Sequence, residues 1–328
     1  MIITQAPYRI SFAGGGTDLP AFCRDEPGAV ISTAIDRHMY VTVGTRFENT
    51  IRVAYSTTEI VETLAQLKHS LVREALRVTG LDRSLEITTI GDVPAGTGMG
   101  SSSALTVGLL AALYAYQGRI ASPEELARLA CEIEIERVGH PIGRQDQYIS
   151  AYGGLQYLRF NPDQTVDVEP VPCSRETLHA LEERLLLVYT GSTRDANEIL
   201  KAQKSATASK LGVLRRMRDL AGEMRDALTG PQGPDLGHFA ELLREGWELK
   251  RTVVSAISTD MVDEWYRRAR AAGARGGKLL GAGGGGFLLL MAEPEHHDAI
   301  RETLGRPKEL PVSFDPRGAR VIFIGNRS

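Results

Sequence analysis

Cysteine is scarce in this sequence of 328 residues, and its three copies lie far apart. Cys23, Cys131 and Cys173 form no CxxC pair, and their number is odd. This pattern argues against a disulfide framework or a zinc site, because both need paired or closely spaced thiols. We therefore expect a protein of a reducing compartment, the cytoplasm.

An excess of one charge and long apolar runs are also lacking. The formal net charge is only −3, so the sequence predicts neither a basic nucleic-acid surface nor an acidic tail. The opening residues MIITQAPYRISF show no basic segment followed by a long apolar stretch, so we expect no signal peptide. The longest strongly apolar run, FLLLMA at 287–292, is far too short to span a bilayer. We expect neither nucleic acid nor a membrane as partner.

The chain does contain an ordinary globular composition and a clear succession of strands and helices. With 42% hydrophobic and 24% charged residues, it suits one large or two modest domains. Segments rich in Val, Ile, Thr and Tyr predict strands at 7–13, 29–35, 39–45, 51–56, 84–90, 154–160, 184–190 and 319–325, and one more after the glycines that end at 286. Apolar residues at helical spacing predict helices at 62–78, 101–116, 122–138, within 195–272 and at 294–304.

The order of these elements favours an α+β protein over a regular alternation of strand and helix. No low-complexity linker separates two parts of the chain. We place the weakly marked boundary so that the two domains are residues 1–185 and 186–328.

A glycine-rich stretch, PAGTGMGSSSAL at 94–105, lies between a predicted strand and a predicted helix. It is not a Walker loop, because that motif has a lysine where Ser101 follows Gly100. It is not a dinucleotide fingerprint either, because Gly96, Gly98 and Gly100 alternate instead of following GxGxxG. Neither of the two common phosphate-binding designs therefore fits.

The stretch nevertheless has the chemistry of a phosphate site. Glycines let the backbone approach an anion, and the following helix presents unpaired N–H groups and a favourable dipole. The hydroxyls of Ser101, Ser102 and Ser103 could help to hold Mg²⁺ beside phosphate. A flexible turn with a serine N-cap is the alternative that this stretch alone leaves open.

Three further clusters carry polar or glycine-rich patterns. GAGGGGF at 281–287 precedes a predicted buried strand, where glycines indicate a close backbone approach or a positive φ. AGGGTDLP at 13–20 places Asp18 after glycines, where its carboxylate could accept hydrogen bonds from sugar hydroxyls or cap a turn. Residues 134–154 combine acids, glycines and an arginine. A carboxylate there could bind Mg²⁺, accept a proton or lie on a solvated helix face.

These clusters, in this order, resemble the motifs of the GHMP kinase family. APYRISFAGGGTD at 6–18, PAGTGMGSSSA at 94–104 and KLLGAGGGGF at 278–287 match its three motifs, with Met99 where leucine is usual. The resemblance covers most of the chain. It implies an ATP- and Mg²⁺-dependent kinase of small molecules with a two-domain α+β fold, ribosomal-S5-domain-2-like at the N-terminus and ferredoxin-like α+β at the C-terminus.

Within the family, three segments resemble the kinases of heptose phosphates. They are GGGTDLP at 14–20, GHPIGRQDQYISAYGGL at 139–155 and YTGSTRDANEIL at 189–200. This resemblance implies phosphorylation of the anomeric hydroxyl of D-glycero-D-manno-heptose 7-phosphate to the 1,7-bisphosphate, by a monomer or homodimer. Kinases of free sugars, of the fucokinase or galactokinase type, share the GGGTD segment and remain an alternative.

Two other classes on the same fold are a non-catalytic sensor and a decarboxylating relative. The presence of every residue that matches the catalytic set argues against a sensor, and the sugar-type GGGTD segment argues against a decarboxylase. The resemblance assigns the catalytic base to Asp146, with Arg9 beside it and beside the transferred phosphate. It assigns Mg²⁺ to Ser102 and Glu134, with Glu136 as the competitor if the register differs.

The resemblance also implies contacts with the two substrates, the acceptor sugar and ATP. ATP is expected to contact Pro94, Gly96, Gly98, Gly100, Ser101, Ser102 and Ser103. The acceptor is expected to contact Gly15, Gly16, Thr17, Asp18, Arg144, Arg194, Gly283 and Gly284. The two arginines are the candidates for binding the acceptor's own phosphate, because a guanidinium forms charge-assisted hydrogen bonds with phosphate.

Overall fold

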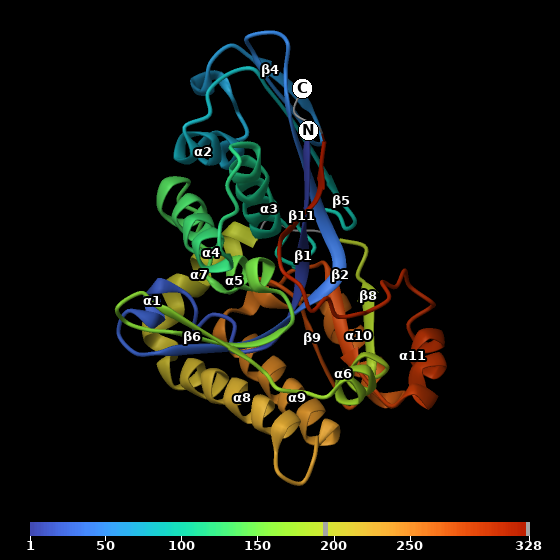
Figure 1. The fold of residues 1–328 in the computed structure, drawn as a ribbon. Helices are drawn as coiled ribbons and strands as arrows, with labels where there is room; N and C mark the ends of the chain where they lie inside the picture. Colours follow the sequence, from blue (N-terminus) through green and yellow to red (C-terminus); the bar gives the residue numbers. More distant parts are fainter. Residues whose placement is uncertain (193–195, 326–328) are drawn as a thin grey trace.

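The computed structural model describes residues 1–192 and 196–325 and contains two β-sheets with helices packed around them (Figure 1). The strands of the large sheet are β1 (Ile2–Ala13), β2 (Gly28–Thr45), β3 (Ile51–Ala54), β4 (Thr58–Val61), β5 (Leu85–Gly91), β6 (Leu155–Phe160), β7 (Val166–Pro170) and β11 (Arg320–Ile324). Their order is β11–β1–β2–β5–β3–β4, with β6 paired to β2 and β7 paired to β6. All pairs are antiparallel except β3 with β5.

Strand β2 is central to this sheet, because it pairs with β1, β5 and β6. The sequence predicts two strands, 29–35 and 39–45, but the chain stays extended through the residues between them. The first half of β2 pairs with β6 and the second half with β5, and β1 runs along both. The register with β1 shifts between Pro7 and Tyr8, where proline has no N–H to donate to the ladder. The long strand thus joins two parts of the sheet and carries β1 toward the cavity described below.

Four helices cover one face of the large sheet (Figure 1). They are α2 (Ser70–Thr79), α3 (Ser101–Tyr116), α4 (Pro123–Cys131) and α5 (Gln145–Tyr152). Helix α3 is buried from Ser103 to Ala115 because it lies between the strands and the other three helices. A helix that is apolar on all sides is stable only in such a position. Its N-terminus, directly after the 94–100 loop, is therefore held firmly against the sheet.

The second sheet has the antiparallel order β8–β10–β9. Its strands are β8 (Leu185–Tyr189), β9 (Gly276–Leu279) and β10 (Phe287–Met291). The remaining helices are α1 (Pro20–Cys23), α6 (Arg175–Glu182), α7 (Ala196–Ala206), α8 (Leu211–Thr229), α9 (Leu236–Val253), α10 (Asp260–Ala271) and α11 (His297–Thr303). Short 3₁₀ turns occur at Leu64–Gln66, Thr207–Lys210, Ser255–Ile257 and Pro294–His296. Helices α8 and α9 pack on each other at the end of the molecule away from β4 (Figure 1).

The last strand returns to the large sheet. Strand β11 pairs with β1, with Ile324 opposite Ile2, so that it lies beside the start of the chain (Figure 1). The predicted domain 186–328 therefore contributes a strand to the sheet of the predicted domain 1–185. The boundary itself stays a prediction. Within the described residues, no helix has both the length and the apolar character needed to cross a membrane.

Several predicted elements differ in extent from the observed ones. The helix predicted at 62–78 begins only at Ser70, because 58–61 forms β4 and a 3₁₀ turn follows. The helix predicted at 122–138 starts as expected, with Ser122 accepting a hydrogen bond from the Glu125 N–H, but it continues past Cys131 as a π-helix, Glu132–Arg137. Three observed elements, β7, α5 and α6, were not predicted from the sequence. Strand β7 is half-exposed and pairs with β6 alone, so its apolar pattern is weak.

Two glycine-rich loops, residues 94–100 and 281–286, touch each other through their backbones. A Cβ atom on Gly98 would lie 2.5 Å from the carbonyl oxygen of Leu280, and one on Gly281 would lie 2.4 Å from Cα of Gly98. Real side chains do not approach so closely. Both glycines also have positive φ, +81° and +69°. The close backbone approach predicted for the second loop is therefore present, and its neighbour is the first loop.

This contact predicts a stability difference between two glycines that share one backbone conformation. Gly80 caps α2 at φ +70° with open space around it, whereas Gly281 has φ +69° and no space. Gly80→Ala should cost only the strain of a left-handed alanine, about 1 kcal/mol. Gly281→Ala should cost about 1–3 kcal/mol more, because the two loops must separate. Urea unfolding midpoints measure both losses, and equal losses would contradict the contact.

Candidate active site

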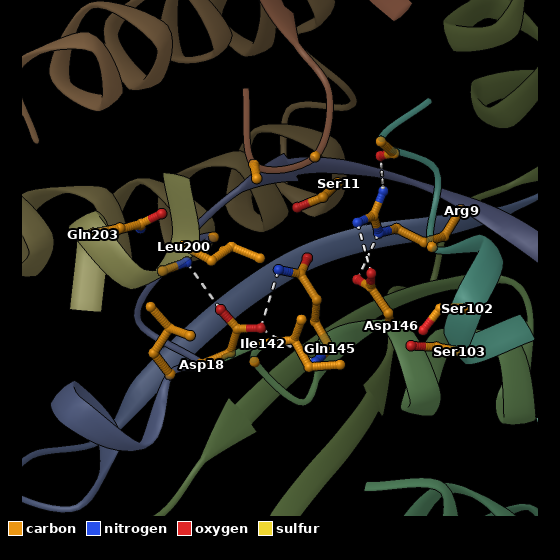
Figure 2. Close-up of a pocket in the computed structure, with 18 of the residues that line it drawn as sticks. Arg9, Ser11, Asp18, Ser102, Ser103, Ile142, Gln145, Asp146, Leu200 and Gln203 are labelled. Carbon is orange, nitrogen blue, oxygen red and sulfur yellow. Dashed lines mark hydrogen bonds and ion pairs between the residues drawn. The ribbon is translucent and has the colours of Figure 1, made fainter. Parts of the chain in front are cut away.

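A cavity of about 380 Å³ lies where the four sequence clusters meet (Figure 2). Its walls come from β1, the loop after β1, the 94–100 loop, the start of α3, the segment leading into α5, α7, α9, β9 and the 281–286 loop. The lining residues range from Arg9 to Ala282, so some of these segments are more than 200 residues apart in the sequence. The fold therefore brings together the residues that the sequence could only associate by motif.

An ion pair between Arg9 and Asp146 lies at the centre of this cavity (Figure 2). The guanidinium of Arg9, on β1, donates Nε–H to Oδ1 of Asp146 at 2.7 Å and Nη2–H to Oδ2 at 2.9 Å. Its third nitrogen, Nη1, donates to the carbonyl oxygen of Gly98 at 2.5 Å. Asp146 is in the first turn of α5, and a Cβ on Gly100 would lie 3.2 Å from Oδ2. The bidentate pair thus fixes the Asp146 carboxylate against the glycine loop.

Glu134 lies behind the start of α3 and is completely buried. Its Oε2 accepts hydrogen bonds from the hydroxyls of Ser102 at 2.5 Å and Ser103 at 3.3 Å. Burial raises the pKa of the Glu134 carboxyl to about 7, although the Ser102 hydroxyl opposes that rise. The Gln147 amide also lowers this pKa slightly, yet Oε1 has no hydrogen bond of normal geometry in the described residues.

This arrangement fits a divalent cation. A buried carboxylate oxygen without a hydrogen bond, beside a serine hydroxyl at the start of a phosphate-loop helix, offers the hard oxygen ligands that Mg²⁺ prefers. Glu134 and Ser102 are the residues that would hold it. Glu136, the competing candidate, is exposed, which favours Glu134. The π-helix that contains Glu134 belongs to a type often seen at functional sites.

Asp18 occupies the opposite end of the cavity (Figure 2). Its Oδ1 accepts from the Gly16 N–H at 2.9 Å, and its Oδ2 accepts from Gln145, from the backbone N–H at 3.3 Å and from Nε2 at 3.1 Å. A Cβ on Gly143 would lie 1.9 Å from Oδ2, so only glycine fits there. Burial raises the pKa of Asp18, and the nearby charge of Asp146 raises it further. The carboxylate is held in one orientation and remains available to hydroxyl donors in the cavity.

The expected ATP-binding loop lines the cavity through Gly96, Gly98, Gly100 and Ser101–Ser103. Pro94 does not line it, and its carbonyl oxygen accepts a hydrogen bond from the Thr97 hydroxyl instead. Gly15 and Gly16 line the acceptor end, whereas Thr17 is buried and its hydroxyl bonds to Gly14 and Ala29. Thr17 therefore shapes the loop that presents its neighbours.

Three other residues expected at the acceptor, Arg144, Gly283 and Gly284, do not line the cavity. Arg144 donates to the carbonyl oxygen of Gln164 at 2.8 Å and to its Oε1 at 2.9 Å, and it does not line the cavity. Gly283 packs on Ile257, and the Gly284 N–H donates to the Ile257 carbonyl oxygen. In the third motif, the cavity is lined by Gly281 and Ala282 instead. Arg194 lies outside the described residues.

Two buried lysines, Lys250 on α9 and Lys278 on β9, also line the cavity. The sequence analysis did not identify either of them as a functional residue. Lys250 donates to the carbonyl oxygen of Gly281, and Lys278 donates to those of Ser11 at 2.8 Å and Phe12 at 3.1 Å. Burial lowers the pKa of Lys250 to about 8 and that of Lys278 well below its usual value. One signal was present in the sequence, because Lys250 interrupts the apolar stripe of α9.

The pKa of Glu134 predicts how stability depends on pH when no metal is bound. The carboxyl titrates near 7 in the folded protein and near its ordinary 4.5 when unfolded, so folding favours the protonated form. The contribution of this carboxyl to the free energy of unfolding is therefore fully present below about pH 4.5 and is lost as the pH rises through 7. The Glu134→Gln variant has no titrating group at this position, so its stability does not decrease with pH for this reason. In chelator, the unfolding free energy of the wild type should fall relative to the variant by up to about 3 kcal/mol between pH 5 and 8.

Urea unfolding at several pH values measures this difference, since the other carboxyl groups cancel between the two proteins. Glu132→Gln is the matched control, because Glu132 is partly exposed and paired with Arg137. It should follow the wild-type curve. Parallel curves for wild type and Glu134→Gln would show that Glu134 is not a buried, proton-binding carboxyl.

Comparisons with known proteins agree with this geometry. The family model of the GHMP kinases N terminal domain matches residues 60–154, and that of the GHMP kinases C terminal domain matches residues 224–309. A D-glycero-alpha-D-manno-heptose 7-phosphate kinase of Campylobacter jejuni is 31% identical over 307 residues, which cover 89% of this chain and 90% of that protein. A bifunctional fucokinase/GDP-fucose pyrophosphorylase of Arabidopsis thaliana is 28% identical, over 94% of this chain and 31% of that protein.

Solved structures show the same fold. A D-glycero-D-manno-heptose 1-phosphate kinase of Bacteroides thetaiotaomicron superposes with a TM-score of 0.82 at 27% identity, over 99% of this chain and all of that one. A putative sugar kinase of Campylobacter jejuni gives a TM-score of 0.77 at 28% identity, over 98% of this chain and 97% of that one. The predicted two-domain α+β fold is thus confirmed. The chain belongs to the GHMP kinase family.

Proposed function

We propose that this GHMP kinase transfers the γ-phosphoryl group of ATP to the anomeric hydroxyl of D-glycero-D-manno-heptose 7-phosphate, to give the 1,7-bisphosphate. One observation carries the proposal. The Arg9–Asp146 pair, the Ser102–Glu134 pair and Asp18 meet around one cavity at the phosphate loop. The Campylobacter jejuni heptose 7-phosphate kinase named above supports the choice of acceptor, and the Bacteroides thetaiotaomicron kinase supports only the class of heptose phosphates.

The phosphate chain of ATP fits the loop from Gly96 to Ser103. Positive φ at Gly96, Gly98 and Gly100 lets the loop turn its N–H groups toward an anion, and α3 adds the positive end of its dipole. Mg²⁺, when bound by Glu134 and Ser102, would neutralise charge on the phosphates. These groups hold and polarise the donor without forming a covalent intermediate.

The transfer needs one proton acceptor. Asp146 takes the proton of the sugar hydroxyl while that oxygen attacks the γ-phosphorus. The bond from the γ-phosphorus to the bridging oxygen breaks, and its electron pair leaves on ADP. Arg9 holds the Asp146 carboxylate in place and adds positive charge next to the transferring group. Asp18 orients the sugar by accepting hydrogen bonds from its hydroxyls.

A kinase of a free sugar, of the fucokinase or galactokinase type, is the second candidate. The position of Arg144 favours it, because this predicted contact for the acceptor's phosphate is turned toward Gln164. The resemblance to the Arabidopsis fucokinase-containing protein points in the same direction. The cytoplasmic location and the monomeric or dimeric state stay predictions.

Removal of the proton acceptor gives a direct test of the mechanism. Asp146→Asn should lower kcat by at least about 100-fold, the usual scale for loss of a general base, because the amide cannot accept the hydroxyl proton. ATP affinity should change little, since the carboxylate faces the acceptor hydroxyl. Steady-state kinetics and nucleotide titration measure the two quantities. Near-normal turnover in a folded variant would show that Asp146 is not the base.

A coupled ADP-release assay over a panel of sugars tests the acceptor. D-glycero-D-manno-heptose 7-phosphate should give a kcat/KM about 30- to 150-fold above those of the free heptose, L-fucose and galactose, because loss of a charge-assisted phosphate contact costs about 2–3 kcal/mol. The panel includes the heptose 1-phosphate, whose anomeric oxygen is blocked, as a matched control. Equal turnover of L-fucose or galactose would overturn the acceptor and leave the kinase family intact.

A further inference from the structure

Lys250 and Lys278 are two buried lysines in one cavity, and within the described part of the chain neither forms an ion pair with a carboxylate. Each side chain is only 6% exposed. Among residues 1–192 and 196–325, their ammonium groups donate to main-chain carbonyl oxygens alone. A buried positive charge is costly unless an anion compensates it. Such a pair beside a phosphate loop indicates that the anion comes with the ligand.

The two lysines are held differently. Lys278 donates to two carbonyl oxygens of β1, those of Ser11 and Phe12, and so ties β9 to β1. Lys250 has a single acceptor among the described residues, the carbonyl oxygen of Gly281. An ammonium group has three donors, so Lys250 keeps two for a ligand. Lys250 is therefore the better placed of the two to bind an anion.

The surroundings of Lys250 indicate which anion it meets. Its acceptor, Gly281, touches Gly98 through the backbone, and the Gly98 carbonyl oxygen accepts from Arg9. Arg9 and Lys250 thus donate to two glycine loops that touch each other, and they lie close enough for the charge of Arg9 to act on Lys250. Both line the same cavity as Asp146, the group that faces the reacting hydroxyl. The anion next to Lys250 is accordingly on the ATP side of the transfer, at its outer end.

We propose that Lys250 binds the oxygens of the transferring γ-phosphoryl group and, together with Arg9, stabilises the charge on that group during transfer. This inference rests on the proposed kinase activity but not on the identity of the acceptor sugar. Lys250 donates hydrogen bonds and exchanges no proton in the step, because the hydroxyl proton goes to Asp146 and the breaking bond leaves its electron pair on ADP. Lys278 positions the floor of the cavity through its contacts with β1.

Three variants separate this role from a structural one. Lys250→Met removes the charge and the donors. Lys250→Gln removes the charge but keeps a polar side chain with N–H donors, so it decides the question if the methionine variant does not fold. Arg251→Met is the matched control, because Arg251 is the next residue of α9, is exposed and pairs with Asp263.

Binding of two nucleotides provides the decisive readout. With Mg²⁺ present, Lys250→Met and Lys250→Gln should weaken binding of a non-hydrolysable ATP analogue by about 10- to 100-fold, the effect of one charge-assisted hydrogen bond, and that of ADP by less than about 3-fold. Calorimetric titration measures both. Because no acceptor is present, an incorrect sugar assignment does not affect the result. Arg251→Met should bind both nucleotides as the wild type does.

Kinetics give the second readout. With whichever sugar is turned over, kcat should fall by at least about 100-fold in both Lys250 variants while the KM of the acceptor changes little. Equal weakening of the ATP analogue and ADP, or no weakening of either, would overturn the proposal. A rise confined to the acceptor KM would also overturn it and would place Lys250 at the acceptor's own phosphate. A loss of the same size in Arg251→Met would mean that α9 as a whole is responsible.

Discussion

The backbone contact between Gly98 and Gly281 is the constraint on which the site depends. It requires glycine at both positions, because any Cβ would lie within about 2.5 Å of the opposite loop. The contact joins the phosphate loop of the first half of the chain to the loop that connects β9 and β10. It also fixes two carbonyl oxygens, that of Gly98, which receives Arg9, and that of Gly281, which receives Lys250. The contact therefore helps to hold both side chains in place, in addition to the bidentate pair of Arg9 with Asp146.

The charges around the cavity are arranged before any ligand binds. Arg9 and Asp146 neutralise each other and hold a fixed geometry, whereas Glu134 is buried among hydroxyl groups that satisfy only one of its oxygens. Lys250 is a buried cation without a carboxylate partner. A kinase acts mainly by positioning its substrates and neutralising charge, so unmet charges held rigidly in a cavity are what the reaction needs. The packing of α3 and the two sheets offsets the free-energy cost of burying these charges.

Local physical chemistry accounts for the differences between predicted and observed elements. Strand β2 was predicted in two pieces, whereas the chain stays extended through Asp36 and Arg37, which form a bulge between the β1-paired residues Ile35 and His38. The helix that carries Glu134 was predicted as regular, whereas it widens into a π-helix that turns this carboxylate inward. Arg144, two residues before Asp146, was expected at the acceptor because of its sequence neighbours alone. In the structure, its guanidinium donates to the carbonyl oxygen and the side chain of Gln164 instead.

The sequence by itself determined the family, the order of strands and helices, and the residues of the three motifs, because these depend on local patterns: alternating apolar residues, glycine spacing and helix caps. It also placed Arg9, Asp146, Ser102, Glu134 and Asp18 among the candidates, and all five meet at or beside the cavity. Only the tertiary structure decided that Glu134 and not Glu136 is buried beside the serines, that the two glycine loops interlock, and that Lys250 enters the site from a helix without any motif. The reason is physical: burial, backbone contact and the pairing of charges arise between separate segments, 32 residues apart for Ser102 and Glu134 and 31 for Lys250 and Gly281, and no local pattern of the chain encodes them.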